Sequence, residues 1–301
     1  MNLSASGKLV IGSLRIDTPN LGDHIQILAC IQMLERMNLK PTVFIDRDTE
    51  LADEPPLETD EDRLLLPLNG WFKLMANNDP QWPPHRKILP IFFGFHIRPH
   101  VCPALLESRS LDYMKTHEPI GCRDPFTMDL LQDNGISAYL TNCLSLTFPA
   151  RSPIHEGDTI VVASTDPKIL EIIPPLYRRN HVYINHYKTL RSFESYMTEA
   201  KALLHFYKRR AKLVITTFLH CALPCIAMGI PVVVFYPNRK EQFWATSDRQ
   251  RFSGLKTIAP IYEFSEVDQV NWNPPRIDVE DQKAMMSRDF CARIEKALDR
   301  F

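Results

Sequence analysis

The 301-residue sequence is short of glycine and lacks any long apolar run. Glycine occurs 10 times against 24 prolines, which argues against flexible linkers between domains. No apolar run approaches the ~20 residues of a transmembrane helix, so no membrane span is predicted. The net charge of −1 provides no general positive field, and nucleic acid is not expected as a partner.

The seven cysteines are scattered, odd in number and contain no Cys-x-x-Cys pair. This pattern does not suit a disulfide framework and favours a reducing compartment. Cys221 and Cys225 are four residues apart among apolar neighbours, which is typical of helix packing. The N-terminal sequence MNLSASGKLVIGSL is too short and too polar to predict a signal peptide. We therefore expect a cytoplasmic protein, or one at the inner face of the membrane.

Nucleotide and metal fingerprints are missing as well. There is no G-x-G-x-x-G and no Walker A sequence, and His181, His186 and His205 lack metal-ligand spacing. The segment DRD at residues 46–48 has the form of the metal-binding DxD of some sugar transferases. It leads into the acidic segment 48–62, and we interpret it as a solvated turn. No metal and no nucleotide cofactor are therefore expected.

Strand-like and helix-like segments alternate along the chain. The runs predicted as strands are residues 8–14, 42–45, 64–66, 88–95, 119–122, 138–141, 159–163, 181–185, 213–217 and 232–235. The predicted helices are residues 23–37, 102–117, 125–134, 167–172, 192–209, a short one ending at Gly229, and 279–301. Such alternation predicts parallel sheets covered by helices.

The polar segment PARSPIHEGD at residues 149–158 divides these elements into two blocks. The fold class predicted is α/β, with two doubly wound, Rossmann-like domains facing a cleft. Their bounds are expected to be 1–150 and 151–301, with the final helix 279–301 able to pack back on the first domain. A cleft between two domains is a favoured place for a ligand.

The most informative stretch is LVITTFLHCALPCIAMGIPVVVF at residues 213–235, which reads as a βαβ unit. Its two flanking runs are almost purely apolar, as strands buried on both faces must be. His220 falls at the carboxyl end of the first strand and on the first turn of the helix. Ligands bind there in open parallel sheets, and the helix N-terminus suits an anion. The alternative is a buried histidine bonded to a backbone carbonyl.

A second group of polar residues is expected at the strand ends of the first domain. Arg123 follows a strand and precedes a helix that Asp124 can cap and Pro125 can start. An arginine in that place can bind a carboxylate or phosphate with two donors. The alternative is an ion pair between Arg123 and Asp124, or one between domains. His96 ends another strand and belongs to the same rim.

Two further segments contain candidate ligand-binding residues. In Asn20-Leu21-Gly22-Asp23, Gly22 permits a tight turn or a close approach and Asp23 is a good N-cap, so a structural role competes with binding. Arg249, Arg251 and Lys256 surround the segment FSGL at residues 252–255. These cations are suited to a phosphate, or they form a solvated basic loop.

Three segments together resemble the polysaccharide pyruvyl transferase family: NLGD at 20–23, PIGCRDPFTMDLL at 119–131 followed by LSLT at 144–147, and TTFLHCALPCIAMGIPVVVF at 216–235. The resemblance runs in order over roughly residues 10 to 260. It implies a two-domain fold like that of glycosyltransferase-B enzymes. It also implies transfer of the pyruvyl group of phosphoenolpyruvate onto two hydroxyls of a sugar, as a cyclic ketal, without a cofactor.

Carried over position by position, the resemblance marks contacts to phosphoenolpyruvate at His96, Arg123, Leu219 and His220, of which Arg123 and His220 are the expected catalytic pair. Asn20 and Asp23 are expected to bind substrate. The family usually has arginine where this chain has Phe218. Either Arg239, Arg249 or Arg251 replaces that cation, or the chemistry is altered or lost.

The sugar acceptor, soluble or lipid-linked, is the other expected partner. Two rival functions remain at this point: a glycosyltransferase with a nucleotide-sugar donor, and a non-catalytic carbohydrate-binding relative. The sequence further predicts that Arg123 and His220 face each other across the cleft, one from each domain.

Overall fold

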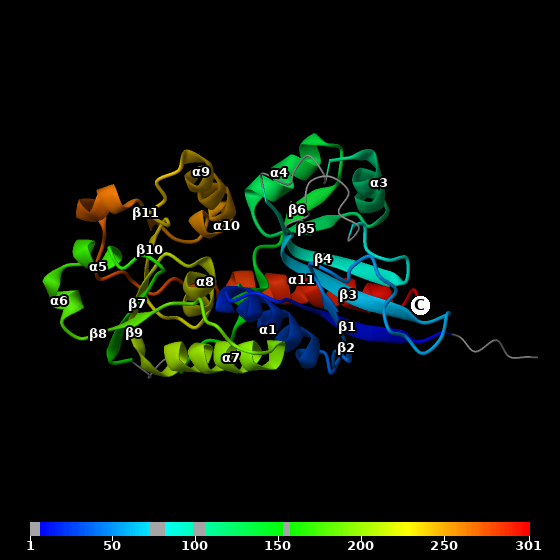
Figure 1. Cartoon of the computed structure of the whole chain (residues 1–301), viewed down its shortest axis with the longest axis horizontal. Coiled ribbons are helices and arrows are strands. Elements are labelled where there is room, and N and C mark those ends of the chain that lie inside the picture. Colours follow the sequence, from blue (N-terminus) through cyan, green and yellow to red (C-terminus); the bar gives the residue numbers. More distant parts are fainter. Residues whose placement is uncertain (1–6, 73–81, 99–105, 153–156) are drawn as a thin grey trace, which may run out of the picture. The chain divides into compact units, whose positions relative to one another are not determined.

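The computed structural model describes residues 7–72, 82–98, 106–152 and 157–301. The chain divides into two compact units (Figure 1). Unit 1 comprises residues 1–16, 30–142 and 285–301, and unit 2 comprises residues 17–29 and 143–284. Among the described residues, no helix combines the length and the apolar character needed to cross a membrane.

Unit 1 is built on a six-stranded sheet in the order β2-β1-β3-β4-β5-β6, and all its strands are parallel. The strands are β1 Leu9–Arg15, β2 Val43–Asp46, β3 Arg63–Phe72, β4 Ile88–Ile97, β5 Ile120–Cys122 and β6 Ala138–Leu140. The central strands β3 and β4 are almost continuously apolar and buried, as strands covered on both faces must be.

The helices around this sheet are α1 Leu21–Arg36, which begins in unit 2 and ends in unit 1, α3 Ser108–Thr116, α4 Pro125–Asp133 and α11 Glu280–Leu298. One hydrophobic core gathers Leu64, Leu66, Phe92 and Phe95 from the two central strands with Trp82. Burial of such large side chains is the main favourable term for this unit.

Unit 2 repeats the plan with five parallel strands in the order β11-β10-β9-β7-β8. The strands are β7 Thr159–Ala163, β8 His181–Ile184, β9 Ala211–Thr216, β10 Val232–Phe235 and β11 Ile261–Tyr262. Its helices are α5 Ile169–Ile172, α6 Pro175–Arg178, α7 Phe193–Arg210, α8 Leu219–Ala227, α9 Gln242–Arg251 and α10 Ser253–Lys256, with 3-10 helices at Leu144–Thr147 and Phe264–Gln269.

Both sheets change direction at an equivalent place. In unit 1 the chain moves outward from β1 to β2 and then returns to place β3 on the other side of β1. In unit 2 it moves from β7 to β8 and then places β9 on the other side of β7. Ligands of doubly wound sheets bind at the carboxyl ends of the strands near such a switch point. His220 follows β9, which is one of the two strands at the switch point of unit 2.

The predicted α/β class with two parallel, Rossmann-like sheets is confirmed, but the division between units differs from 1–150 and 151–301. Residues 17–29 group with the second sheet instead of the first. The reason is backbone pairing: Leu21 N donates to His186 O at 2.9 Å, and Asn20 forms an antiparallel bridge with Tyr187. The longer segment of unit 2 begins at Cys143, ahead of the polar segment.

The final helix belongs mainly to unit 1, which takes residues 285–301. Phe290 is fully buried, and its ring meets that of Phe93 edge-on at 5.3 Å between centroids. Arg293 donates to Pro119 O at 2.9 Å and lies over the ring of Tyr139. The helix therefore covers the sheet of unit 1 through both apolar and polar contacts.

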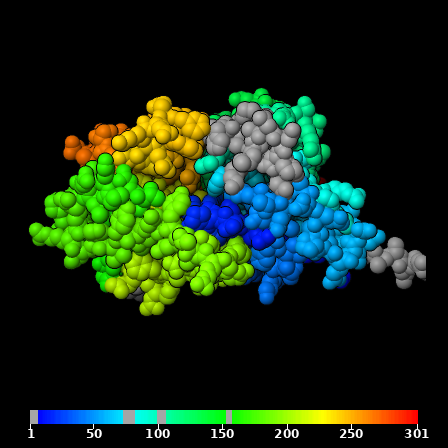
Figure 2. Space-filling model, in the orientation of Figure 1, coloured from blue at the N-terminus to red at the C-terminus, as the bar shows by residue number. Residues whose placement is uncertain are grey.

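Several predicted elements are wrong in kind or extent. The basic segment around Arg249 and Arg251 is helical, in α9 and α10, instead of a loop, and α9 lies at the surface of unit 2 (Figure 2, gold). It was missed because its polar residues leave no apolar stripe. Strand β3 extends far beyond residues 64–66. Of the predicted helix 102–117, residues 102–105 lie outside the described residues, and the helix seen is Ser108–Thr116.

We expect Phe290→Ala to lower the free energy of unfolding by about 3–5 kcal/mol, because the cavity left on the sheet of unit 1 cannot close fully. Met285→Ala on the same helix is the control. Its side chain is 59% exposed, and its effect should stay within about 0.5 kcal/mol. Equal effects in urea denaturation would contradict the packing described for α11.

Candidate active site

His220 is positioned by the turn between β9 and α8. Thr216 ends the strand, and its hydroxyl accepts a hydrogen bond from Phe218 N at 2.9 Å. The chain then enters α8 at Leu219, and His220 has φ −88° and ψ 19°, outside the helical range. Such bridge-region backbone is common at active sites. The side chain is only 2% exposed, so it faces protein on most sides.

The segment at the start of α1 closes around this histidine. A Cβ atom on Gly22 would lie 3.2 Å from both Cβ and Nδ1 of His220, and 3.1 Å from Asn20 Oδ1. A larger residue would therefore be tightly packed against both side chains, and glycine permits the close approach that one of the two sequence interpretations expected. Asn20 Oδ1 accepts from Gly22 N at 3.0 Å. Asn20 and His220, which are distant in sequence, therefore lie together within unit 2.

The expected N-cap at Asp23 is corrected by the structure. The helix begins two residues earlier, at Leu21, and the side chain that accepts a hydrogen bond from the first-turn backbone is that of Asn20. Asp23 lies within the first turn, where its carboxylate accepts from Gln26 Nε2 at 3.3 Å and from Asn20 Nδ2 at 3.4 Å. Its negative charge also suits the positive end of the helix dipole.

A pocket of unit 2 collects residues that follow four parallel strands. Thr165 follows β7, Tyr187 follows β8, the turn before α8 follows β9, and Pro237 follows β10. The lining residues are Asn20, Gly22, Thr165, His186, Tyr187, Thr217, Phe218, Leu219, His220, Pro237, Arg239 and Arg251. The expected substrate-binding residues Asn20, Leu219, Arg239 and Arg251 thus share one pocket with His220. Asp23 does not line it.

The enclosed volume of this pocket is small, about 30 Å³. That is room for about one or two waters, or for one anionic group of a larger ligand. The rest of such a ligand must lie at the rim or displace rim side chains.

The three candidate replacement cations differ in their partners. Arg249 pairs with Glu263 at 2.8 Å and does not line the pocket. Arg239 lines it and pairs with Asp248 at 3.2 Å. Arg251 lines it without an ion pair or hydrogen bond among the residues that the structure describes, and its Nε atom is buried. A buried guanidinium nitrogen without a partner is costly, and guanidinium groups are well suited to bind anions.

Aromatic rings form the other side of the pocket. Phe218 stacks on His186 with centroids 4.5 Å apart and a 20° interplanar angle, and Tyr187 lies 6.5 Å from Phe218. The Nε2 atom of His186 shares a hydrogen bond of 2.8 Å with the Tyr207 hydroxyl. Sequence reasoning tested His186 only for metal-ligand spacing. The rule that found His220 would also have found it, because it comes two residues after the end of β8.

The buried thiol of Cys221, the residue after His220, interacts with His186 and Tyr207. Burial alone would raise the pKa of Cys221, but hydrogen bonds from Cys225, His186 and Tyr207 and the charge of His186 hold that pKa well below its ordinary value. The side chain is completely buried, so this thiol is not positioned as a nucleophile toward a ligand. Among the described cysteines no disulfide is present.

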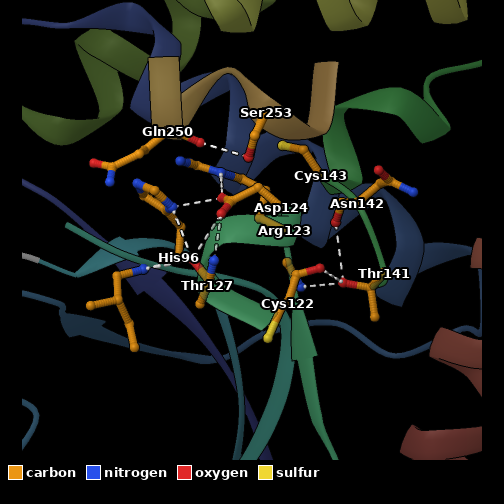
Figure 3. Close-up of polar contacts among 12 residues, drawn as sticks. His96, Cys122, Arg123, Asp124, Thr127, Thr141, Asn142, Cys143, Gln250 and Ser253 are labelled. Carbon is orange, nitrogen blue, oxygen red and sulfur yellow. Dashed lines mark hydrogen bonds and ion pairs between the residues drawn. The ribbon is translucent and has the colours of Figure 1, made fainter. Parts of the chain in front are cut away.

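In unit 1 a buried cluster is centred on Asp124 (Figure 3). One carboxylate oxygen, Oδ1, accepts from both the backbone N and the hydroxyl of Thr127 at 2.9 Å, which caps α4 as predicted. The other, Oδ2, lies 2.6 Å from His96 Nδ1 and 3.5 Å from Arg123 Nε. His96 and Arg123 therefore share one rim, as expected, and the alternative Arg123–Asp124 ion pair is present.

Electrostatics keep Asp124 charged in this cluster. Burial works to raise the pKa of its carboxyl, but the charges of His96 and Arg123 and the hydrogen bonds from His96 and from Thr127 N together hold that pKa below its ordinary value. A buried carboxylate with cationic and N–H partners is stable only while those partners remain in place. Asp124 thus fixes the orientation of His96 and Arg123.

The interpretation of residues 46–48 as a solvated turn is corrected in part. Asp46 and Arg47 are buried, Asp46 Oδ1 accepts from Asp48 N at 3.0 Å, and Arg47 pairs with Asp48 at 3.0 Å. The carboxylate of Asp46 is thus used inside the turn. Within the described ranges, no group of three or more His, Cys, Asp or Glu side chains is arranged to hold a metal ion.

Two parallel α/β sheets with polar groups at the carboxyl ends of their strands define a Rossmann-like α/β protein. Within that class the chain belongs to the polysaccharide pyruvyl transferase family, whose model matches residues 20–239. The resemblance found in the sequence is therefore confirmed. The match includes Asn20, His96, Arg123 and His220, whereas Arg251 lies beyond its end.

One solved structure that aligns with the chain is that of an uncharacterised protein from Klebsiella pneumoniae subsp. pneumoniae NTUH-K2044. It is 16% identical, and the alignment covers 82% of this chain and 89% of that one with a TM-score of 0.48. None of the curated proteins compared with the chain is similar enough to be counted as a relative.

Asp124→Asn should lower the free energy of unfolding by about 3–5 kcal/mol at neutral pH, because it removes the charge that His96 and Arg123 face. The folded-state pKa of Asp124 is depressed, so its contribution is complete above the unfolded pKa of about 3.9 and is lost as the pH falls through the folded value. The difference between wild type and variant should therefore shrink only in acid.

Urea denaturation at neutral pH and below pH ~3.9 measures both values. Asp129→Asn is the control on the same helix, because Asp129 is exposed. A loss of stability that is equal for the two variants, or that does not change with pH, would contradict the assigned role of Asp124.

Proposed function

We propose that this protein transfers the pyruvyl group of phosphoenolpyruvate onto two hydroxyls of a sugar, forming a cyclic ketal, in a glycosyltransferase-B-like arrangement of its two units. One observation carries the proposal: His220, a proton-transfer group, shares a pocket with Arg251, a cation whose Nε has no partner among the described residues. Membership of the family supplies the reaction class.

The chemistry requires anion binding and proton transfer. Phosphoenolpyruvate carries a carboxylate and a phosphate, so its site needs cations and helix N-termini. A proton added to the methylene carbon makes C2 electrophilic. One sugar hydroxyl then adds to C2 and loses its proton, phosphate leaves with the C–O bonding pair, and the second hydroxyl closes the ketal. No step requires a metal or a nucleotide.

His220 is the proposed acid and base for these proton transfers. Imidazole changes protonation near neutral pH and can therefore both donate and accept. Its position at the first turn of α8 also places it beside the positive end of a helix dipole, where an anionic donor is favoured. The small pocket volume suits one anionic group of the donor held between His220 and Arg251, with Asn20 beside it.

Arg123 and His96 are proposed as the contribution of unit 1. Arg123 follows β5 and His96 is the penultimate residue of β4, and Asp124 orients both side chains. Pairing with Asp124 leaves a guanidinium with further donors, so an ion pair and a ligand contact are compatible. That Arg123 faces His220 across an interdomain cleft stays a prediction.

The decisive experiment is mass spectrometry of glycans, free and lipid-linked, incubated with the protein and phosphoenolpyruvate. The expected product is heavier by the mass of phosphoenolpyruvate less one phosphoric acid, and one phosphate is released per product. Turnover of nucleotide sugars instead would identify a glycosyltransferase. Glycan binding without turnover of any donor would identify a non-catalytic relative.

We expect His220→Gln to reduce turnover ~100- to 10,000-fold while largely sparing binding of phosphoenolpyruvate, since a general acid–base group contributes about that factor. Steady-state kinetics and calorimetry of donor binding separate the two effects. His205→Gln, at an exposed position of α7, should change neither. Parallel losses of binding and turnover would limit His220 to donor anchoring.

Arg251→Ala should weaken binding of phosphoenolpyruvate by about tenfold to a hundredfold, the value of one lost charge-assisted contact of ~1.5–3 kcal/mol. Arg249→Ala is the matched control, because it removes the same charge two residues earlier in the sequence. The Arg249 side chain pairs with Glu263 and does not line the pocket. Equal effects of the two variants in calorimetry would show a diffuse charge effect instead of a contact by Arg251.

A further inference from the structure

A second cavity of unit 2 lies at the amino ends of its strands. It is lined by residues at or before the starts of three neighbouring strands: Ile160 in β7, Lys212 and Leu213 in β9, and Pro231 before β10. The pocket that contains His220 collects residues after the carboxyl ends of the same parallel strands. The two cavities are therefore at opposite edges of one sheet. The volume of the second is about 460 Å³, within the usual range of small-molecule sites.

The charges around this cavity are all of one sign. Arg151, Lys212 and Arg276 line it, and its described lining includes no carboxylate. Arg151 is 5% exposed, and its guanidinium donates to Ala211 O at 2.7 Å, which fixes it at the start of β9. Lys212 and Arg276 are exposed at the cavity. Three cations around one cavity favour an anion, and arginine in particular favours phosphate.

Two aromatic rings provide the apolar wall. Tyr177 and Trp272 lie 5.9 Å apart between centroids with a 33° interplanar angle, and both are only partly buried. Both also pack against the hydrophobic core of the unit, which holds them in place. A fixed, partly exposed aromatic pair is suited to a flat or ring-shaped group, such as a base or a sugar.

We propose that this cavity binds a phosphorylated ring compound, either a sugar phosphate or a nucleotide. The phosphate lies among Arg151, Lys212 and Arg276, and the ring lies against Tyr177 and Trp272. This site is separate from the proposed donor pocket. Arg151 N donates to Met228 O, just after the last residue of α8, whereas His220 is at the opposite end of that helix.

Calorimetry with five probes tests the proposal: uridine monophosphate, glucose 1-phosphate, uridine, glucose and inorganic phosphate. At least one ring phosphate should bind ten or more times tighter than its ring alone and than inorganic phosphate, an advantage of ~1.4 kcal/mol or more. Tighter binding of uridine monophosphate identifies a nucleotide site, and tighter binding of glucose 1-phosphate identifies a sugar-phosphate site. Equal binding of inorganic phosphate, or no binding, overturns the proposal.

Variants show at which cavity the probe binds. Lys212→Glu and Arg276→Glu, both at exposed positions, should each weaken it at least tenfold, about 1.4 kcal/mol, by reversing a charge at the cavity. Lys201→Glu makes the same reversal on α7, away from the cavity lining, and should have no effect. Arg251→Ala should also leave this binding unchanged. Loss of binding in Arg251→Ala without loss in Lys212→Glu would move the probe to the donor pocket and overturn the proposal.

Failure here is distinguishable from failure of the proposed transfer reaction. Lys212→Glu should retain binding of phosphoenolpyruvate, which depends on the other edge of the sheet. Ring phosphates can thus bind whether or not ketal formation is observed, and ketal formation can occur whether or not ring phosphates bind.

Discussion

Parallel pairing of every strand is the constraint on which the rest of this structure depends. It directs the carboxyl ends of all strands in a sheet to one edge and their amino ends to the other. Loops that are distant in sequence are thereby brought together without any attraction between their side chains. The pocket of unit 2 is built this way, from turns that follow β7, β8, β9 and β10. The second cavity of that unit is the counterpart at the amino edge.

The two units hold their cations by different means. In unit 1, His96 and Arg123 converge on the buried carboxylate of Asp124, which also caps α4. Their geometry is rigid because the cap, the strand ends and the charges are mutually dependent. In unit 2, Arg251 lines the pocket without a described partner, while Arg239 is neutralised by Asp248. The first arrangement favours orientation, and the second leaves a charge for a ligand.

Phe218 occupies the position where the family pattern resembled by this sequence has arginine. In the structure its ring stacks on His186, whose Nε2 atom also shares a hydrogen bond with the hydroxyl of Tyr207. An aromatic ring is well suited to this place because it stacks on the flat imidazole. Phenylalanine at this position is therefore packed against His186 in unit 2. The pocket retains two cations, Arg251 from α9 and Arg239 from the turn after β10.

The sequence by itself determined the α/β class, the strand-end positions of His96, Arg123 and His220, and the cap at Asp124, because apolar period, turn residues and capping are local signals. Only the tertiary structure decided that residues 17–29 join unit 2, that Asn20 adjoins His220, and that His186 and Arg251 share its pocket. These depend on backbone pairing and on which cations already have partners, as Arg249 has in Glu263. No local pattern encodes such long-range pairing, because each partner is chosen only once the chain is folded.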